Sequence, residues 1–170
     1  MLTGLSLLFV GAVLCTNGLW MLGRIADREI IFINLFTGLV TGAVAVKTAF
    51  GAQANLGDVR LAALTLMFTT TYLWVAANRI LELDGRGLGW FSLFVAVTVA
   101  PVMVQELSGA QTALGVWMAL SWGIWAVLWG MYFALLSLGW KITRSTAYLT
   151  LFSGVFTGWL PAMLLLNDVR

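Results

Sequence analysis

Residues 112–138 read TALGVWMALSWGIWAVLWGMYFALLSL, a run without a single charged residue. A helix that crosses the hydrocarbon layer of a membrane needs about 20 consecutive apolar residues. Backbone polar groups in lipid must bond within their own segment, which favours a helix over an open strand. The stretch therefore predicts a membrane-spanning helix.

Five further runs of the same kind flank this one, separated by short polar linkers. The chain is 61% hydrophobic and 9% charged, with a mean hydropathy of +0.98, whereas soluble domains carry about 25% charged residues. We expect an all-α integral membrane protein with one domain, residues 1–170, whose six helices cover residues 2–22, 30–50, 59–81, 88–107, 112–138 and 145–166.

The composition excludes several classes of function. The chain has no histidine and a single cysteine, Cys15, so it lacks an imidazole base, a histidine metal site and an internal disulfide. Its net charge of +2 is spread along the chain and offers no basic face to nucleic acid. We therefore expect no enzyme activity, no metal or cofactor and no nucleic-acid partner.

Positive charges are distributed unevenly between the linkers. Six lie at or beside the first, third and fifth linkers, and three fall toward the other side: Arg24, Arg28, Arg79, Arg86, Lys141 and Arg144 against Lys47, Arg60 and Arg170. Such an excess marks the cytoplasmic side. We expect a membrane protein with both termini outside; the alternative is the opposite orientation with a signal-anchor start.

The even-numbered runs share a pattern. Residues 36–42 and 152–158 both read Phe-[Ser/Thr]-Gly-x-x-Thr-Gly, and Phe91-Ser92 is a weaker copy. The pattern predicts three helical hairpins of one kind around an axis along the membrane normal, with a seam where a solute could pass. The alternative is a chance match between residues that are common in membrane helices.

No charged residue lies near the centre of any span, and Glu106 is the one carboxylate close to a span that could couple transport to protons. Ion-coupled transporters usually keep an ionisable group at mid-depth. An uncharged pathway rejects ions because their dehydration is costly, while a small neutral molecule loses far less. This favours passive passage of a neutral solute; a proton-coupled transporter is the alternative, and a scaffold without transport is a third.

Three tryptophans mark one face of residues 112–138. Trp122, Trp125 and Trp129 follow i, i+3, i+7 spacing, so their rings face one way. At about 1.5 Å per residue they cover roughly 10 Å in the middle of the span, too deep for an interfacial belt. We interpret them as lining a pathway; a packing core and a lipid-facing stripe are the alternatives.

Residues 59–81 supply a candidate opposite wall. Thr70, Trp74 and Asn78 lie along one side together with Met67 and Thr71, and this mixture of groups suits a wet cavity. Asn17 and Asn34 are further amides within spans, and an amide in hydrocarbon needs a partner. For these two we favour a hydrogen bond between helices over a role in the pathway. An aromatic slot with few polar groups suits planar neutral amides.

At these residues the chain resembles the bacterial family of acid-activated urea channels and short-chain amide channels. The resemblance covers nearly the whole chain. It rests on Val10-Gly11-x-x-Leu14-x-x-Asn17, Asn34-Leu35-Phe36, Phe68, Thr71-Tyr72-Leu73-Trp74-x-Ala76-Ala77-Asn78, residues 90–96, Trp122-x-x-Trp125-x-x-Leu128-Trp129 and Thr157-x-Trp159-x-Pro161-Ala162.

The resemblance implies a homo-hexamer in membrane lipid, one pore per six-helix protomer, and urea, formamide or acetamide as the solute. It also implies a functional link to a cytoplasmic urease or amidase. With the polar positions above, the implied pore-lining set is Val10, Leu14, Asn17, Thr70, Trp74, Asn78, Trp122, Trp125, Leu128, Trp129 and Ser153.

Two departures from the acid-gated members stand out. Those members carry a glutamate where this chain has Ser153, and a histidine-rich outer loop where residues 51–58 are short and histidine-free. Both departures argue against acid gating, and the chain looks more like the amide branch or an ungated urea channel.

Overall fold

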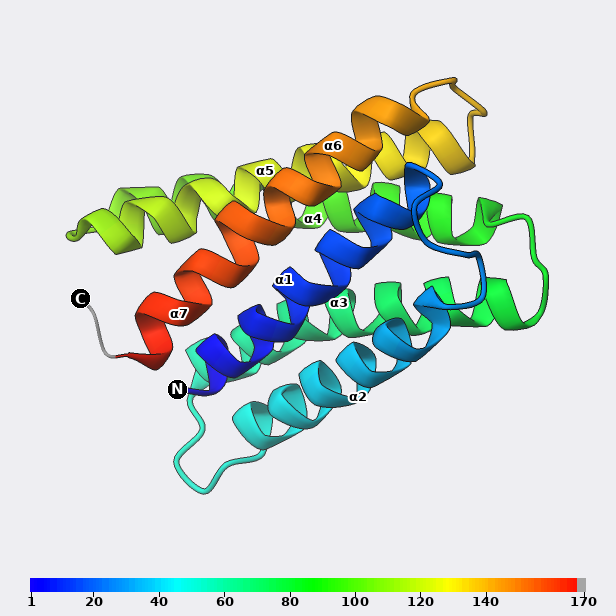
Figure 1. Cartoon of the computed structure of the whole chain (residues 1–170). Coiled ribbons are helices and arrows are strands. Elements are labelled where there is room, and N and C mark those ends of the chain that lie inside the picture. Colours follow the sequence, from blue (N-terminus) through cyan, green and yellow to red (C-terminus); the bar gives the residue numbers. More distant parts are fainter. Residues whose placement is uncertain (168–170) are drawn as a thin grey trace.

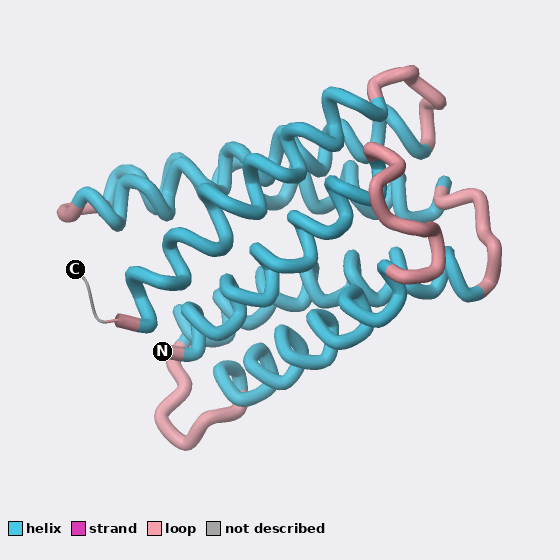
Figure 2. The backbone as a smooth tube through the Cα atoms, in the orientation of Figure 1, coloured by secondary structure: helices cyan, strands magenta, loops and turns pink. Residues whose placement is uncertain are grey.

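The structure is a bundle of six long helices, and the computed structural model describes residues 1–167 (Figures 1 and 2). Each is long and apolar enough to cross a membrane. The elements are α1 Leu2–Met21, α2 Ile30–Ala49, α3 Leu56–Ile80, α4 Arg86–Gly109, α5 Ala113–Leu136, and a sixth span made of α6 Thr143–Ser153, η1 Gly154–Trp159 and α7 Leu160–Leu166. The predicted all-helical class and its six spans are confirmed.

The largest boundary difference is at α3, which begins at Leu56 instead of residue 59. The side chain of Asn55 accepts hydrogen bonds from the backbone N–H groups of Gly57 and Asp58, and the Asp58 carboxylate accepts one from the N–H of Asn55. This capping box satisfies N–H groups that a helix start leaves unpaired. Residues 56–58, which the sequence placed in a linker, therefore form the first turn of the helix.

The helices form a ring in chain order. The closest packing is between α2 and α3, between α4 and α5, and between α1 and the α6–η1–α7 span. Gly38 of α2 lies against Leu73 of α3, and Gly154 of η1 lies against α1. Gly38 and Gly154 occupy equivalent positions in the repeated pattern. Each of them faces the odd-numbered helix that comes next around the ring.

The sixth span contains a widened π-helical turn, η1. Pro161 follows it and lacks the N–H that would continue an α-helical ladder. The indole N–H of Trp117 on α5 donates to the carbonyl oxygen of Phe156 within this turn at 2.8 Å. The irregular turn is therefore held by α5.

The two ends of the bundle differ. The α1–α2, α3–α4 and α5–α6 loops lie together at one end, on the right in Figure 1, which we call the loop-side end. The N-terminus, the α2–α3 and α4–α5 loops and the end of α7 lie at the other, the N-side end. Arg24, Lys141 and Arg144 thus gather at the loop-side end as predicted, while Arg170 is outside the described residues.

Candidate functional site

Three cavities follow one another through the bundle. The N-side vestibule measures about 470 Å³, the central chamber about 40 Å³ and the loop-side vestibule about 430 Å³. Phe68 and Trp125 line both the N-side vestibule and the central chamber. Val75, Leu88 and Tyr132 line both the central chamber and the loop-side vestibule. The cavities therefore adjoin from one end of the bundle to the other.

The central chamber is lined by uncharged side chains from four helices: Leu14 and Asn17 of α1, Phe68, Thr71, Tyr72 and Val75 of α3, Leu88 and Ser92 of α4, and Trp125, Leu128, Trp129 and Tyr132 of α5. Two of its four hydroxyls donate to backbone carbonyls: Thr71 donates to the carbonyl of Met67 and Ser92 to that of Leu88. Their oxygens keep the capacity to accept. The chamber is thus apolar, with a few acceptors.

An aromatic cluster narrows the N-side entrance to this chamber. The ring of Phe68 lies 4.8 Å from Trp125 and 4.6 Å from Trp129, edge to face, and Trp122 lies 4.9 Å from Trp125. The Trp125 N–H donates to the Thr157 hydroxyl at 2.7 Å, and Trp129 donates to Thr71 at 3.3 Å. Since the N–H groups of Trp125 and Trp129 are engaged, these two residues offer a solute their ring edges and faces.

Asn17 and Asn34 form a reciprocal pair between α1 and α2. Each side-chain amide donates to the other, at 3.1 and 2.7 Å, and Asn34 also donates to the carbonyl of Ile30. The hydrogen bond between helices that the sequence favoured is therefore present. Asn17 in addition lines the central chamber, so the pair fixes one wall of it.

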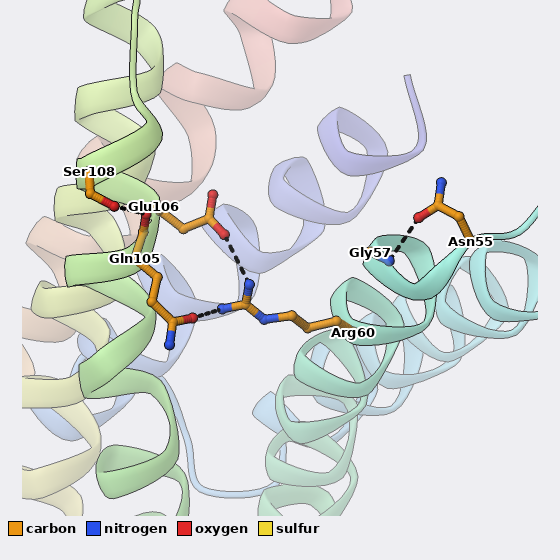
Figure 3. Close-up of polar contacts among 6 residues, drawn as sticks. All are labelled: Asn55, Gly57, Arg60, Gln105, Glu106 and Ser108. Carbon is orange, nitrogen blue, oxygen red and sulfur yellow. Dashed lines mark hydrogen bonds and ion pairs between the residues drawn. The ribbon is translucent and has the colours of Figure 1, made fainter.

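Charged groups in the N-side vestibule lie at its rim. Arg60 of α3 donates to Gln105 and pairs with Glu106 of α4, 3.8 Å away (Figure 3). The vestibule is also lined by Val10, Trp122 and Asp58. Half of the Glu106 side chain is exposed (51%), so this carboxylate sits at the end of its span and not in the chamber.

The loop-side vestibule is polar. Its lining includes Asn78, Arg79, Asp84 and Trp20. Arg79 pairs with Asp27 at 3.2 Å and lies over the Trp20 ring. Hydrogen bonds from the backbone N–H and then the guanidinium of Arg86 lower the pKa of Asp84. This carboxylate is therefore ionised at neutral pH, and fixed charge borders the chamber on this side.

The structure gathers Val10, Leu14, Asn17, Asn78, Trp122, Trp125, Leu128 and Trp129 around these cavities. It places the other three predicted residues elsewhere. Thr70 is exposed on the outside of α3, and Trp74 packs on Phe91 of α4 with ring centroids 5.7 Å apart. Ser153 is fully buried, is not among the lining residues, and its hydroxyl has no hydrogen-bond partner among residues 1–167.

The predicted set and the cavity lining differ mainly in the face of α3. Phe68, Thr71, Val75 and Asn78 line the cavities, whereas the predicted stripe included Thr70 and Trp74. Neighbouring residues on a helix differ by about 100° in direction, so a stripe displaced by one position faces α4 or the outside. Tyr72, Val75, Leu88 and Ser92 were missed as lining residues; Phe68, Thr71 and Val75 do repeat at helical spacing, which is the signal available.

No group of three or more histidine, cysteine, aspartate or glutamate side chains within residues 1–167 is arranged to hold a metal ion. The lining offers apolar contact, aromatic edges and hydrogen-bond acceptors. That arrangement suits the passage of a neutral solute.

Comparisons with known proteins agree with this geometry. The chain is 40% identical over 170 residues to a protein of Mycolicibacterium smegmatis named as an amidate substrates transporter, covering 96% of this chain and 76% of that protein. It is 30% identical to the acid-activated urea channel of Helicobacter pylori strain J99, covering 95% and 96% of the two chains.

Solved structures show the same likeness. The crystal structure of the urea channel from Helicobacter pylori is similar with a TM-score of 0.83 at 31% identity, covering 99% of this chain and 98% of that one. A closed-state structure of that channel gives the same TM-score. The model of the AmiS/UreI family transporter matches residues 2–169. The protein is therefore a multi-pass membrane protein and not an enzyme, and it belongs to the AmiS/UreI family of transporters.

Proposed function

We propose that the protein conducts urea or a short aliphatic amide passively across the bacterial inner membrane, through a pathway within each subunit. The observation that carries this proposal is the central chamber, which has only uncharged lining residues and lies between two vestibules whose linings include charged side chains. Since a water needs about 10–15 Å³ of such space, a chamber of about 40 Å³ accommodates a molecule the size of about three waters.

Selection against ions follows from the same lining. Moving a bare ion into apolar surroundings costs on the order of tens of kcal/mol in idealised estimates. A neutral amide loses about 2–7 kcal/mol of hydration without partners, and acceptors on Ser92 and Asn17 offset part of that loss. Planar solutes such as urea, formamide and acetamide also contact the ring edges of Phe68 and Trp125.

The eight predicted residues that surround the cavities are proposed as pore-lining residues. Orientation and assembly are also part of the proposal. The basic loop-side end faces the cytoplasm by the positive-inside rule, so the N-side vestibule and both termini face outward. The outer surface of the subunit carries large apolar side chains such as Phe32, Leu39 and Phe94, which suits contact with lipid and with neighbouring subunits of a homo-hexamer. A cytoplasmic urease or amidase would keep the inner solute concentration low.

Relatives of both named kinds support either solute class. The higher identity to the amidate substrates transporter favours short amides. Glu106, the candidate for proton coupling, is half exposed and paired with Arg60, and it does not line the central chamber. We therefore place passive conduction ahead of proton coupling.

A permeability series tests the proposal. Stopped-flow uptake of urea, formamide, acetamide and propionamide into proteoliposomes is expected to exceed that of protein-free liposomes, to saturate weakly and to ignore a protonophore. Because the chain has no histidine, the side chain whose ordinary pKa lies between 5 and 8, fluxes at pH 7.5 and 5.5 are expected to be similar. Glu106→Gln is expected to leave uptake unchanged; loss of uptake in this variant, or on adding a protonophore, contradicts the passive account.

A further inference from the structure

Three residues lie where the central chamber adjoins the loop-side vestibule. Val75 of α3, Leu88 of α4 and Tyr132 of α5 each line both this chamber and the loop-side vestibule. Side chains from three different helices therefore meet where the two cavities adjoin. We call these three residues the loop-side collar.

The collar lies equally far from the aromatic entrance along α3 and along α5. On α3 the entrance residue Phe68 and the collar residue Val75 are seven positions apart, and so are Trp125 and Tyr132 on α5. Two helical turns correspond to about 10 Å along each helix. Both helices thus give the chamber the same length, with a constriction at each end.

Tyr132 is held firmly in this position. Its hydroxyl lies 3.0 Å from the Thr150 hydroxyl of α6 and 3.4 Å from the sulfur of Met21 at the end of α1. The ring is thereby tied to two helices besides its own. Leu88 is 5% exposed, so the collar has little room to yield.

We propose that Val75, Leu88 and Tyr132 form a specificity-determining collar that limits solute size independently of the tryptophan cluster. The inference rests on the proposed function and identifies the solute class as planar amides with no more than a short alkyl group. Beyond the collar, the lining of the loop-side vestibule includes the polar and charged side chains of Asn78, Arg79 and Asp84, so a solute that passes the collar reaches the first charged groups on this side.

Narrowing the collar gives the sharpest test, because widening one of two constrictions in series leaves the other in place and changes the flux less. Val75→Phe is expected to lower acetamide flux in proteoliposomes about tenfold and formamide flux less, since one methyl or methylene group in a tight apolar site changes a rate by about tenfold or more. Val127→Phe, on the exposed face of α5, is the matched control and should conduct as wild type.

Rescue separates a shared constriction from general damage. Adding Tyr132→Ala to Val75→Phe is expected to restore acetamide flux, because the added ring then has room across the collar. Leu88→Phe, on a third helix, repeats the test should Val75→Phe fail to assemble in detergent size-exclusion chromatography. Wild-type flux through either assembled variant overturns the inference, as does a loss that Tyr132→Ala fails to relieve. Absence of amide flux through the wild type would instead contradict the proposed function.

Discussion

Replacing Ser92 by phenylalanine is expected to close the central chamber of each subunit. Ser92 is 1% exposed, lines the chamber from α4, and donates its hydroxyl to the carbonyl of Leu88 one turn back. The chamber holds about 40 Å³, which is space for about three waters at about 10–15 Å³ each. A phenyl ring therefore fills the available space and leaves none for a solute.

The loss of folding stability expected for Ser92→Phe is moderate. Overpacking a buried site typically costs about 1–3 kcal/mol, and the carbonyl of Leu88 keeps its place in the helix when the hydroxyl is lost. Val97→Phe on the same helix adds a comparable ring to the exposed outer surface, where Val97 is 67% exposed. Comparing Ser92→Phe with Val97→Phe separates the closing of the chamber from the effect of adding a ring to α4.

Stopped-flow acetamide uptake at matched protein density gives the answer. We expect Ser92→Phe to fall to the rate of protein-free liposomes and Val97→Phe to remain at the wild-type rate. Size-exclusion chromatography and thermal unfolding in detergent confirm assembly of both. An assembled Ser92→Phe protein that conducts acetamide like wild type would refute the assignment of the chamber as the pathway.

Two further predictions concern the cluster and the packing. Trp125→Ala is expected to raise propionamide flux relative to formamide a few-fold, because it opens the N-side entrance while the loop-side collar still limits passage. Trp117→Ala loses an indole hydrogen bond to the same sixth span and should leave the ratio unchanged; equal ratios would mean that Trp125 only packs. Gly11→Ala places a Cβ 2.6 Å from the backbone nitrogen of Trp159 and should lower thermal stability by about 1–3 kcal/mol. Gly130→Ala is the control, because Gly130 has open space around it, and it should not lower stability. An equal loss of stability in both variants would contradict close packing of α1 on η1.

The six spans could be predicted from the sequence because charge-free runs of this length have one stable solution in lipid. The Trp122, Trp125 and Trp129 face was also identifiable, since three large rings at helical spacing in the middle of a span must share a direction. What lies opposite them is decided by tertiary packing. For that reason the sequence identified Phe68 only as a residue that resembles the family pattern. It did not show that Phe68 packs against Trp125.

The residues on α3 show where sequence reasoning reaches its limit. A hydroxyl in a membrane helix is satisfied by the carbonyl one turn back, as with Thr71 and Met67, so hydroxyls do not mark the wet side. Trp74 was assigned to the pathway by its residue type, although its partner is Phe91. Ser153 was assigned by family resemblance alone, and its burial beside α1 follows from the glycine packing of the sixth span.

An experimental density map obtained with a heavy-atom analogue of the solute tests the central claim most directly. Selenourea has the planar shape of urea, and selenium can be located by anomalous scattering in crystals of the protein in lipid. The account predicts an anomalous peak in the central chamber of each subunit, between Phe68 and Leu88. Lipid chains lying against Trp122 and Trp129, with no peak between the helices of a subunit, would contradict it.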